Sequence, residues 1–102
     1  MQEYTFMFSF PFLGERISTE LKSKTIGSSF ALKAAHNLLI SFKDTYKDDL
    51  SRKRDLLLLQ YPEEECFIKN LTISTKEFSS MDLDVLKPEI AQKFLGELQT
   101  LS

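Results

Sequence analysis

Four phenylalanines spaced two residues apart constrain the fold of this chain more than any other feature. Phe6, Phe8, Phe10 and Phe12 alternate with smaller or more polar residues. Successive side chains of a β-strand point to opposite faces, so this spacing places all four rings on one face. The pattern predicts a strand over residues 2–13. We expect the aromatic face to be the main core face, covered by helices, because aromatic side chains bury the most apolar area.

A second strand is predicted directly after the first. Gly14 can take the backbone conformation of a tight turn, and residues 16–25 then alternate again, with Ile17 and Leu21 on one face. The two strands are therefore predicted to form a β-hairpin. Pro11 has no N–H for a ladder, so we expect its end of the strand to lie at a sheet edge or at the hairpin tip.

Two amphipathic helices are also predicted. The first begins after Gly27, at serines that can cap it, and ends near Lys47, because Asp49 would fall in the apolar arc; a continuation through Arg54 is the alternative. Its predicted core stripe consists of Ala31, Leu32, Ala35, Leu38, Leu39, Phe42 and Tyr46. The second helix opens with Pro88 at its first position. Its apolar side consists of Ile90, Ala91, Phe94, Leu95, Leu98 and Leu101.

The segment between the helices is predicted to hold two more strands. The apolar run at residues 56–59, closed by Pro62, suits a buried central strand. After an acidic turn at residues 62–65, the spacing of Phe67, Leu71 and Ile73 predicts a strand that ends around residue 75. An irregular connection is expected from there to residue 87.

These elements predict one α+β domain over residues 1–102. The fold is expected to be a two-layer sandwich in β-β-α-β-β-α order, with a mainly antiparallel four-stranded sheet and both helices on one face. A hairpin followed by a helix and further strands is also the order of a β-grasp domain, but a likeness of element order implies no function.

Composition narrows the function classes. The net charge of −2 is too small to steer the whole molecule toward nucleic acid or an acidic membrane. The apolar stretch at residues 4–13 is too short to cross a bilayer, so no membrane partner is expected. The single cysteine, Cys66, excludes an internal disulfide and zinc sites built from paired thiolates, and favours a reducing, cytoplasmic location.

The chain offers few groups for catalysis. It has one histidine and one cysteine, and three glutamates precede Cys66 and make it a poor nucleophile. His36 falls on the solvent side of the first helix. The glycines stand alone and form no phosphate-binding loop. We therefore expect no catalytic residues, no cofactor, no metal site and no enzymatic activity.

Charge is unevenly distributed along the chain. Residues 1–62 carry nine basic and seven acidic side chains, whereas residues 63–102 carry four and eight. Several of the basic residues fall on one side of the first helix or just beyond it. This predicted basic strip, with an isoleucine at its centre, comprises Lys33, His36, Ile40, Lys43, Lys47, Arg52, Lys53 and Arg54.

The sequence favours a small interaction module over an enzyme. We expect an accessory or inhibitor-type protein, of the short kind that viruses and mobile elements encode, which binds a protein partner through the basic strip. The alternative is a nucleic-acid-binding protein whose strip contacts phosphates. An aromatic sheet that stacks RNA bases is a weaker idea, because the RNA-recognition motif is absent. A homo-oligomer could form through the other sheet face, at Met7, Ser9, Ser18 and Cys66.

Overall fold

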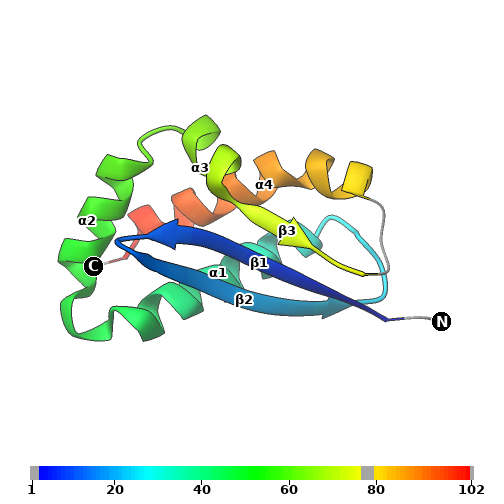
Figure 1. Cartoon of the computed structure of the whole chain (residues 1–102), viewed down its shortest axis with the longest axis horizontal. Coiled ribbons are helices and arrows are strands. Elements are labelled where there is room, and N and C mark those ends of the chain that lie inside the picture. The colour runs from blue at the N-terminus through cyan, green and yellow to red at the C-terminus, as the bar shows by residue number, and fades with distance from the viewer. Residues whose placement is uncertain (1–2, 77–79, 102) are drawn as a thin grey trace.

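The structure, a computed structural model, describes residues 3–76 and 80–101. A three-stranded antiparallel sheet carries α1 and α4 on one face (Figure 1). The elements are β1 (Tyr4–Phe12), β2 (Glu15–Ser23), α1 (Phe30–Thr45), the 3-10 turn η1 (Lys47–Asp49), α2 (Leu50–Gln60), α3 (Glu64–Asn70), β3 (Thr72–Ser74) and α4 (Ser80–Gln99). The predicted α+β class is confirmed. The predicted four strands and β-β-α-β-β-α order are not, because the described residues form three strands and four α-helices.

The predicted hairpin is confirmed. β1 and β2 pair antiparallel along their whole length, from Tyr4 opposite Ser23 to Phe12 opposite Glu15. Leu13 and Gly14 form the turn with φ of 51° and 78°, the two positive values that a type I′ turn requires. Pro11 lies near this tip, as predicted.

The aromatic face of β1 forms the centre of the core. Phe6, Phe8, Phe10 and Phe12 are 0–1% exposed. Their rings contact rings from the helices, with centroid distances of 4.8 Å from Phe6 to Phe30, 5.6 Å from Phe10 to Phe94 and 6.1 Å from Phe12 to Phe42. The ladder is therefore covered, and it cannot present an open stacking surface to RNA bases.

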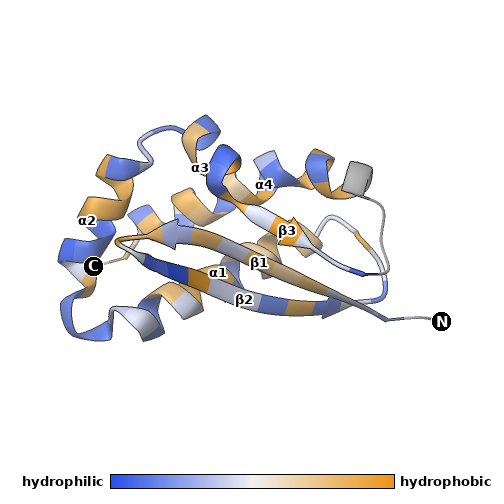
Figure 2. Cartoon of the chain, in the orientation of Figure 1, coloured by the Kyte–Doolittle hydropathy of each residue, from blue (hydrophilic) through white to orange (hydrophobic). Residues whose placement is uncertain are grey.

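The sheet has the strand order β2-β1-β3, and β3 pairs only with the middle of β1, from Met7 to Ser9. The sheet face away from the helices, which we call the open face, is exposed or half-buried throughout. It consists of Thr5, Met7, Ser9, Pro11, Arg16, Ser18, Glu20, Lys22, Thr72 and Ser74. Figure 2 shows how hydrophilic and hydrophobic residues alternate along β2 as a result. Cys66, expected on this face, lies in α3 instead.

The strand predicted at residues 56–59 is wrong, since these residues belong to α2. Leu57 is fully buried, Leu56 and Leu58 are half-buried, and Leu59 is 76% exposed. A central strand would have buried both of its faces, whereas this helix presents mainly one residue in four to the core. α2 ends at Gln60, and this helix lies at the same end of the molecule as the hairpin tip (Figure 1).

The strand predicted from Phe67 to residue 75 is also largely wrong. Residues 64–70 form α3, and only residues 72–74 are a strand. Glu64 and Glu65, predicted to lie in a turn, occupy the first turn of α3, where the helix dipole favours carboxylates. Phe67 faces the core from this helix.

The helix limits also differ from the prediction. α1 ends at Thr45, two residues before the predicted end near Lys47, and it does not continue through Arg54. Leu32 is 48% exposed, and Ala34 takes the predicted core place beside Ala31 and Ala35. α4 begins at Ser80, so Pro88 lies inside it rather than at its first position. Part of the predicted irregular connection, residues 77–79, lies outside the described residues.

Candidate functional site

The outer side of α1 is the most distinctive surface of the described chain. The buried residues of α1 are Phe30, Ala31, Ala34, Ala35, Leu38, Leu39 and Phe42. A separate set lies within an arc of about 100° on the opposite side, at 100° per residue, and every member is exposed. We call this set the α1 outer face: Leu32, Lys33, His36, Ile40 and Lys43. It unites four members of the predicted basic strip with one residue that was predicted to be core.

Two aliphatic side chains give this face its apolar part. Leu32 is 48% exposed and Ile40 is 43% exposed. They are eight residues apart, so they stand about 12 Å apart along the helix axis at 1.5 Å per residue. His36 lies one turn from each of them. The sequence had placed Leu32 in the core because a wide apolar arc on the helical wheel included it.

No carboxylate in the described part of the chain pairs with the cations of the α1 outer face. Among the residues that the structure describes, ion pairs join Arg54 to Asp55, Lys69 to Glu65 and Lys87 to Asp84, and none involves α1. Lys33 and Lys43 therefore present their charge to solvent. A partner with carboxylates could pair with both without breaking a contact within the fold.

The remaining members of the predicted strip lie in η1 and α2. Lys47 and Arg52 are exposed. The Lys53 ammonium lies 5.7 Å from the centre of the Tyr46 ring, which follows α1. Arg54 is half-buried, donates a hydrogen bond to the carbonyl of Leu101 and pairs with Asp55 at 3.0 Å. Arg54 is thus engaged inside the fold, where it ties α2 to the end of the chain.

A hollow of about 380 Å³ adjoins the α1 outer face. It is lined by Leu21, Leu32, Lys33, His36, Asn37 and Glu97. Asn37 donates a hydrogen bond from Nδ2 to the carbonyl of Glu20 at 3.4 Å, so this side chain links α1 to β2. One carboxylate oxygen of Glu97 is buried and accepts no hydrogen bond from the described residues. Leu21 and Leu32 add apolar lining to this hollow.

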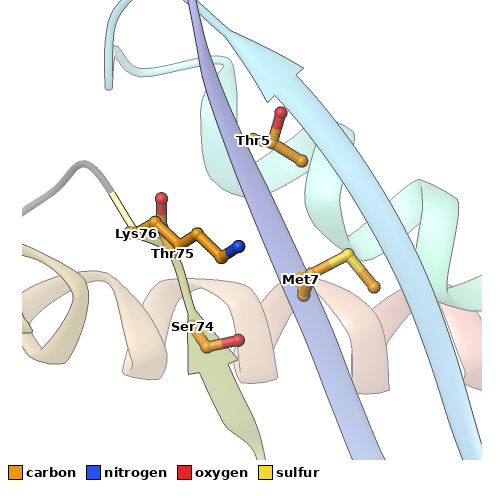
Figure 3. Close-up of a pocket in the computed structure, with 5 residues that line it drawn as sticks. All are labelled: Thr5, Met7, Ser74, Thr75 and Lys76. Carbon is orange, nitrogen blue, oxygen red and sulfur yellow. The ribbon is translucent and has the colours of Figure 1, made fainter.

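A second hollow, of about 400 Å³, lies where β3 ends beside β1. Figure 3 shows its lining residues: Thr5 and Met7 from β1, Ser74 at the end of β3, and Thr75 and Lys76 directly after it, with the Lys76 side chain extending toward β1. Its lining combines hydroxyl groups, a thioether and one ammonium. No local sequence pattern signals this hollow, because it unites two segments that are far apart in the chain.

Two tyrosine hydroxyls hold the hairpin tip. The Tyr61 hydroxyl donates to the carbonyl of Pro11 at 2.6 Å, and burial raises the pKa of this tyrosine. The Tyr46 hydroxyl lies 3.3 Å from both the carbonyl of Phe12 and the carboxylate of Glu15. Burial raises the pKa of Tyr46 most, and the negative charge and hydrogen bond of Glu15 raise it further. These contacts are structural and tie the hairpin to the ends of α1 and α2.

His36 and Cys66 lie on different elements. Cys66 is half-buried in α3, and its carbonyl accepts a hydrogen bond from Asn70. It does not line the hollow beside His36. Within residues 3–76 and 80–101, no group of three histidine, cysteine or carboxylate side chains is placed to hold a metal ion. The absence of a catalytic role stays a prediction.

None of the helices in the described part of the chain is both long enough and apolar enough to span a bilayer. Comparison with protein-family models, curated proteins and solved structures gives no significant match to this chain. Function therefore has to be argued from the surfaces described above.

Proposed function

We propose that this chain is a small, non-catalytic docking module that binds a protein partner through the α1 outer face. The observation that supports the proposal is the exposure of Leu32 and Ile40, 48% and 43%, among cations that no described carboxylate neutralises. Exposed aliphatic side chains within a charged rim are typical of the anchor residues of protein interfaces.

The partner is inferred to present apolar side chains flanked by carboxylates. Leu32 and Ile40 would be covered by the apolar side chains, while Lys33 and Lys43 would pair with the carboxylates at the rim. A nucleic acid would match the cations but not the aliphatic pair, because phosphate contacts leave such side chains in water. The β1 aromatic rings cannot stack bases, since they are buried.

The energy available at this face suits a reversible interaction. Full burial of a leucine or isoleucine stabilises by about 1.5–3 kcal/mol, and each of these two side chains is already roughly half-buried. Covering both would contribute about 2 kcal/mol in total. The rim charges would add mainly to the rate of association and to partner choice.

The test compares two single variants of the whole chain. Ile40→Asp removes an anchor and places a negative charge where an acidic partner would dock, whereas Leu59→Asp makes the same kind of change on α2, where Leu59 is 76% exposed. Each tagged protein is used to capture partners from the native host, and captured proteins are identified by mass spectrometry. We expect proteins that are retained by the wild type and by Leu59→Asp and lost with Ile40→Asp.

The captured protein is then purified and titrated with each variant at several salt concentrations. The expected result is a loss of at least about tenfold in affinity for Ile40→Asp, with the free energy of unfolding changed by less than about 1 kcal/mol. A large loss of stability would mean that Ile40 belongs to the core. Capture of nucleic acid with a steep dependence of affinity on salt would support the alternative function.

A further inference from the structure

The outer edge of β2 carries backbone groups that no strand in the described part of the chain pairs with. Phe12 and Glu15 flank a two-residue turn, so they form a hydrogen-bonded pair, and bonded pairs recur at every second residue from there. The backbone N–H and C=O groups of the residues in between therefore point away from β1. These residues are Arg16, Ser18, Glu20 and Lys22. β2 lies at the edge of the sheet (Figure 1).

Only one of these outward groups has a partner among the described residues. The carbonyl of Glu20 accepts a hydrogen bond from Asn37 at 3.4 Å. A carbonyl oxygen has two lone pairs, so this long bond leaves Glu20 able to accept a second donor. The side chains of the four outward residues are exposed and lie on the open face, so the buried Ile17 and Leu21 take no part.

We propose that the β2 edge pairs antiparallel with the β2 edge of a second copy, with the two-fold axis at Ser18. In this register Ser18 faces Ser18, and Arg16 of each copy faces Glu20 of the other. Two symmetric pairs of opposite charge then stand across the interface, on the open face. Cross-strand neighbours of opposite charge stabilise a sheet, whereas like charges destabilise it.

The charged side chains favour this register over those in which the two-fold axis lies at another residue of β2. A two-fold axis at Thr19 would place Arg16 opposite Lys22, and an axis at Glu20 would place the two Glu20 side chains opposite each other. An axis at Ile17 would leave Arg16 opposite Ser18 and form no charge pair. A two-fold axis at Leu21 would also bring opposite charges together, Glu20 with Lys22, but only two facing pairs of outward residues would then lie within β2. The register centred on Ser18 has three such pairs within β2, so it combines opposite charges with the longer ladder.

The proposed contact joins two three-stranded sheets into one continuous sheet. It would form about six backbone hydrogen bonds, two for each pair of facing outward residues. In the single chain, Arg16 donates to the Ser9 hydroxyl at 3.1 Å, so its guanidinium already lies on the open face. Because one pair of edge strands makes the whole contact, we expect it to bury less than about 1,200 Å² in total, which is typical of weak interfaces. We therefore expect a dissociation constant on the order of 10 µM. The β2 edge adjoins the hollow beside the α1 outer face, but the proposed pairing uses other residues and does not depend on the proposed docking function.

The test is a charge exchange followed by sedimentation velocity over a range of protein concentrations. Because the contact is symmetric, each substitution acts twice in one dimer. Arg16→Glu alone and Glu20→Arg alone should each weaken dimerisation by at least about tenfold, since each puts like charges opposite one another. The double variant Arg16→Glu/Glu20→Arg should recover dimerisation, because it restores opposite charges in reverse order.

Two further variants keep the result decisive. Lys22→Glu makes the same change of charge on the same strand, but in this register Lys22 faces the turn residue Gly14, so the dimer should persist. Ser18→Pro removes an N–H that points outward and should abolish dimerisation without unfolding the edge strand, as thermal unfolding would confirm. A wild type that stays monomeric at 11.8 kDa at every concentration overturns the proposal, as does a double variant no better than either single one.

Discussion

The two faces of β1 differ sharply in burial and in composition. On the helix side, Phe6, Phe8, Phe10 and Phe12 are 0–1% exposed and pack against rings from α1, α3 and α4. On the open side the same strand carries threonine, methionine, serine and proline, and Met7 is 42% exposed.

This difference shows that one layer of helices supplies nearly all the apolar burial of the sheet. Aromatic side chains bury about 150–250 Å² each, and apolar burial stabilises by about 25 cal/mol per Å². No described element covers the open face, so its side chains can change without disturbing the core. The helix side therefore determines stability, and the open face and the α1 outer face are available for contacts with other molecules.

The largest expected effect is that of Phe10→Ala on the helix side. The Phe10 ring lies 5.2 Å from that of Phe67, 5.6 Å from Phe94 and 6.3 Å from Tyr61, so its removal leaves a cavity between three elements. We expect the free energy of unfolding to fall by about 3–5 kcal/mol, measured by equilibrium unfolding in urea.

Phe10→Leu accompanies this variant in case the alanine variant does not fold. It retains most of the apolar volume and should lose clearly less stability than Phe10→Ala. A loss of under about 1 kcal/mol for Phe10→Ala would contradict the view that this face determines stability.

We expect Tyr61→Phe to cost an intermediate amount of stability. This variant tests the outer edge of β1 at Pro11, which lies between the buried face and the open face of the strand. The Pro11 carbonyl points away from β2, and β3 pairs only with Met7–Ser9, so β3 cannot reach it. The Tyr61 hydroxyl supplies the hydrogen bond instead, at 2.6 Å. Removing the hydroxyl should lower the free energy of unfolding by about 1 kcal/mol in urea titrations, while the ring contacts remain.

The same variant also predicts a difference in how the free energy of unfolding depends on pH above neutrality. Burial raises the pKa of Tyr61, so the folded chain keeps the phenol proton at a pH where the unfolded chain loses it. This contribution to stability is complete below about pH 10 and is lost as the pH rises through the raised pKa. Between about pH 9 and about pH 11, Tyr61→Phe should therefore lose less stability than the wild type. An equal loss in both proteins would mean that the Tyr61 phenol is not stabilised by the fold.

The sequence predicted those parts of the fold in which one period dominates. Alternation along residues 4–12 and 15–23 identified the hairpin and its core face, and helical spacing identified most of the core residues of α1 and of the second half of α4. In each case one face is buried and the other is not, so the period is visible without knowledge of the neighbours.

The middle of the chain has no such period. Four consecutive leucines at residues 56–59 fit a strand as well as a helix, and nothing in the run shows that Leu57 alone is fully buried while Leu59 is exposed. A signal for α3 was present, because Phe67 and Leu71 are four residues apart, and the Leu71 N–H bonds to the Phe67 carbonyl. Pro88 was misleading, since a proline that favours a helix start also occurs within α4.

The candidate site was predictable only in part, for a related reason. Helical spacing alone places Lys33, His36, Ile40 and Lys43 on one side of α1. The exposure of Leu32 was missed because the wheel cannot show how far a neighbouring helix covers each flank of an apolar stripe. The hollow between Met7 and Lys76 was missed because it depends on the pairing of β1 with β3, which no local pattern encodes.

The smallest expected effect is that of Met7→Thr on the open face, and it is the most direct way to break the comparison. Threonine suits a strand, and Met7 is 42% exposed, so the free energy of unfolding in urea should change by less than about 0.5 kcal/mol. Phe10, three residues along the same strand, is the matched buried position. If Met7→Thr instead cost more than about 1.5 kcal/mol, and the cost grew with protein concentration, the open face would have to be covered by a second copy of the chain. The two faces of β1 would then both be buried, and pairing would proceed face to face rather than through the edge of β2.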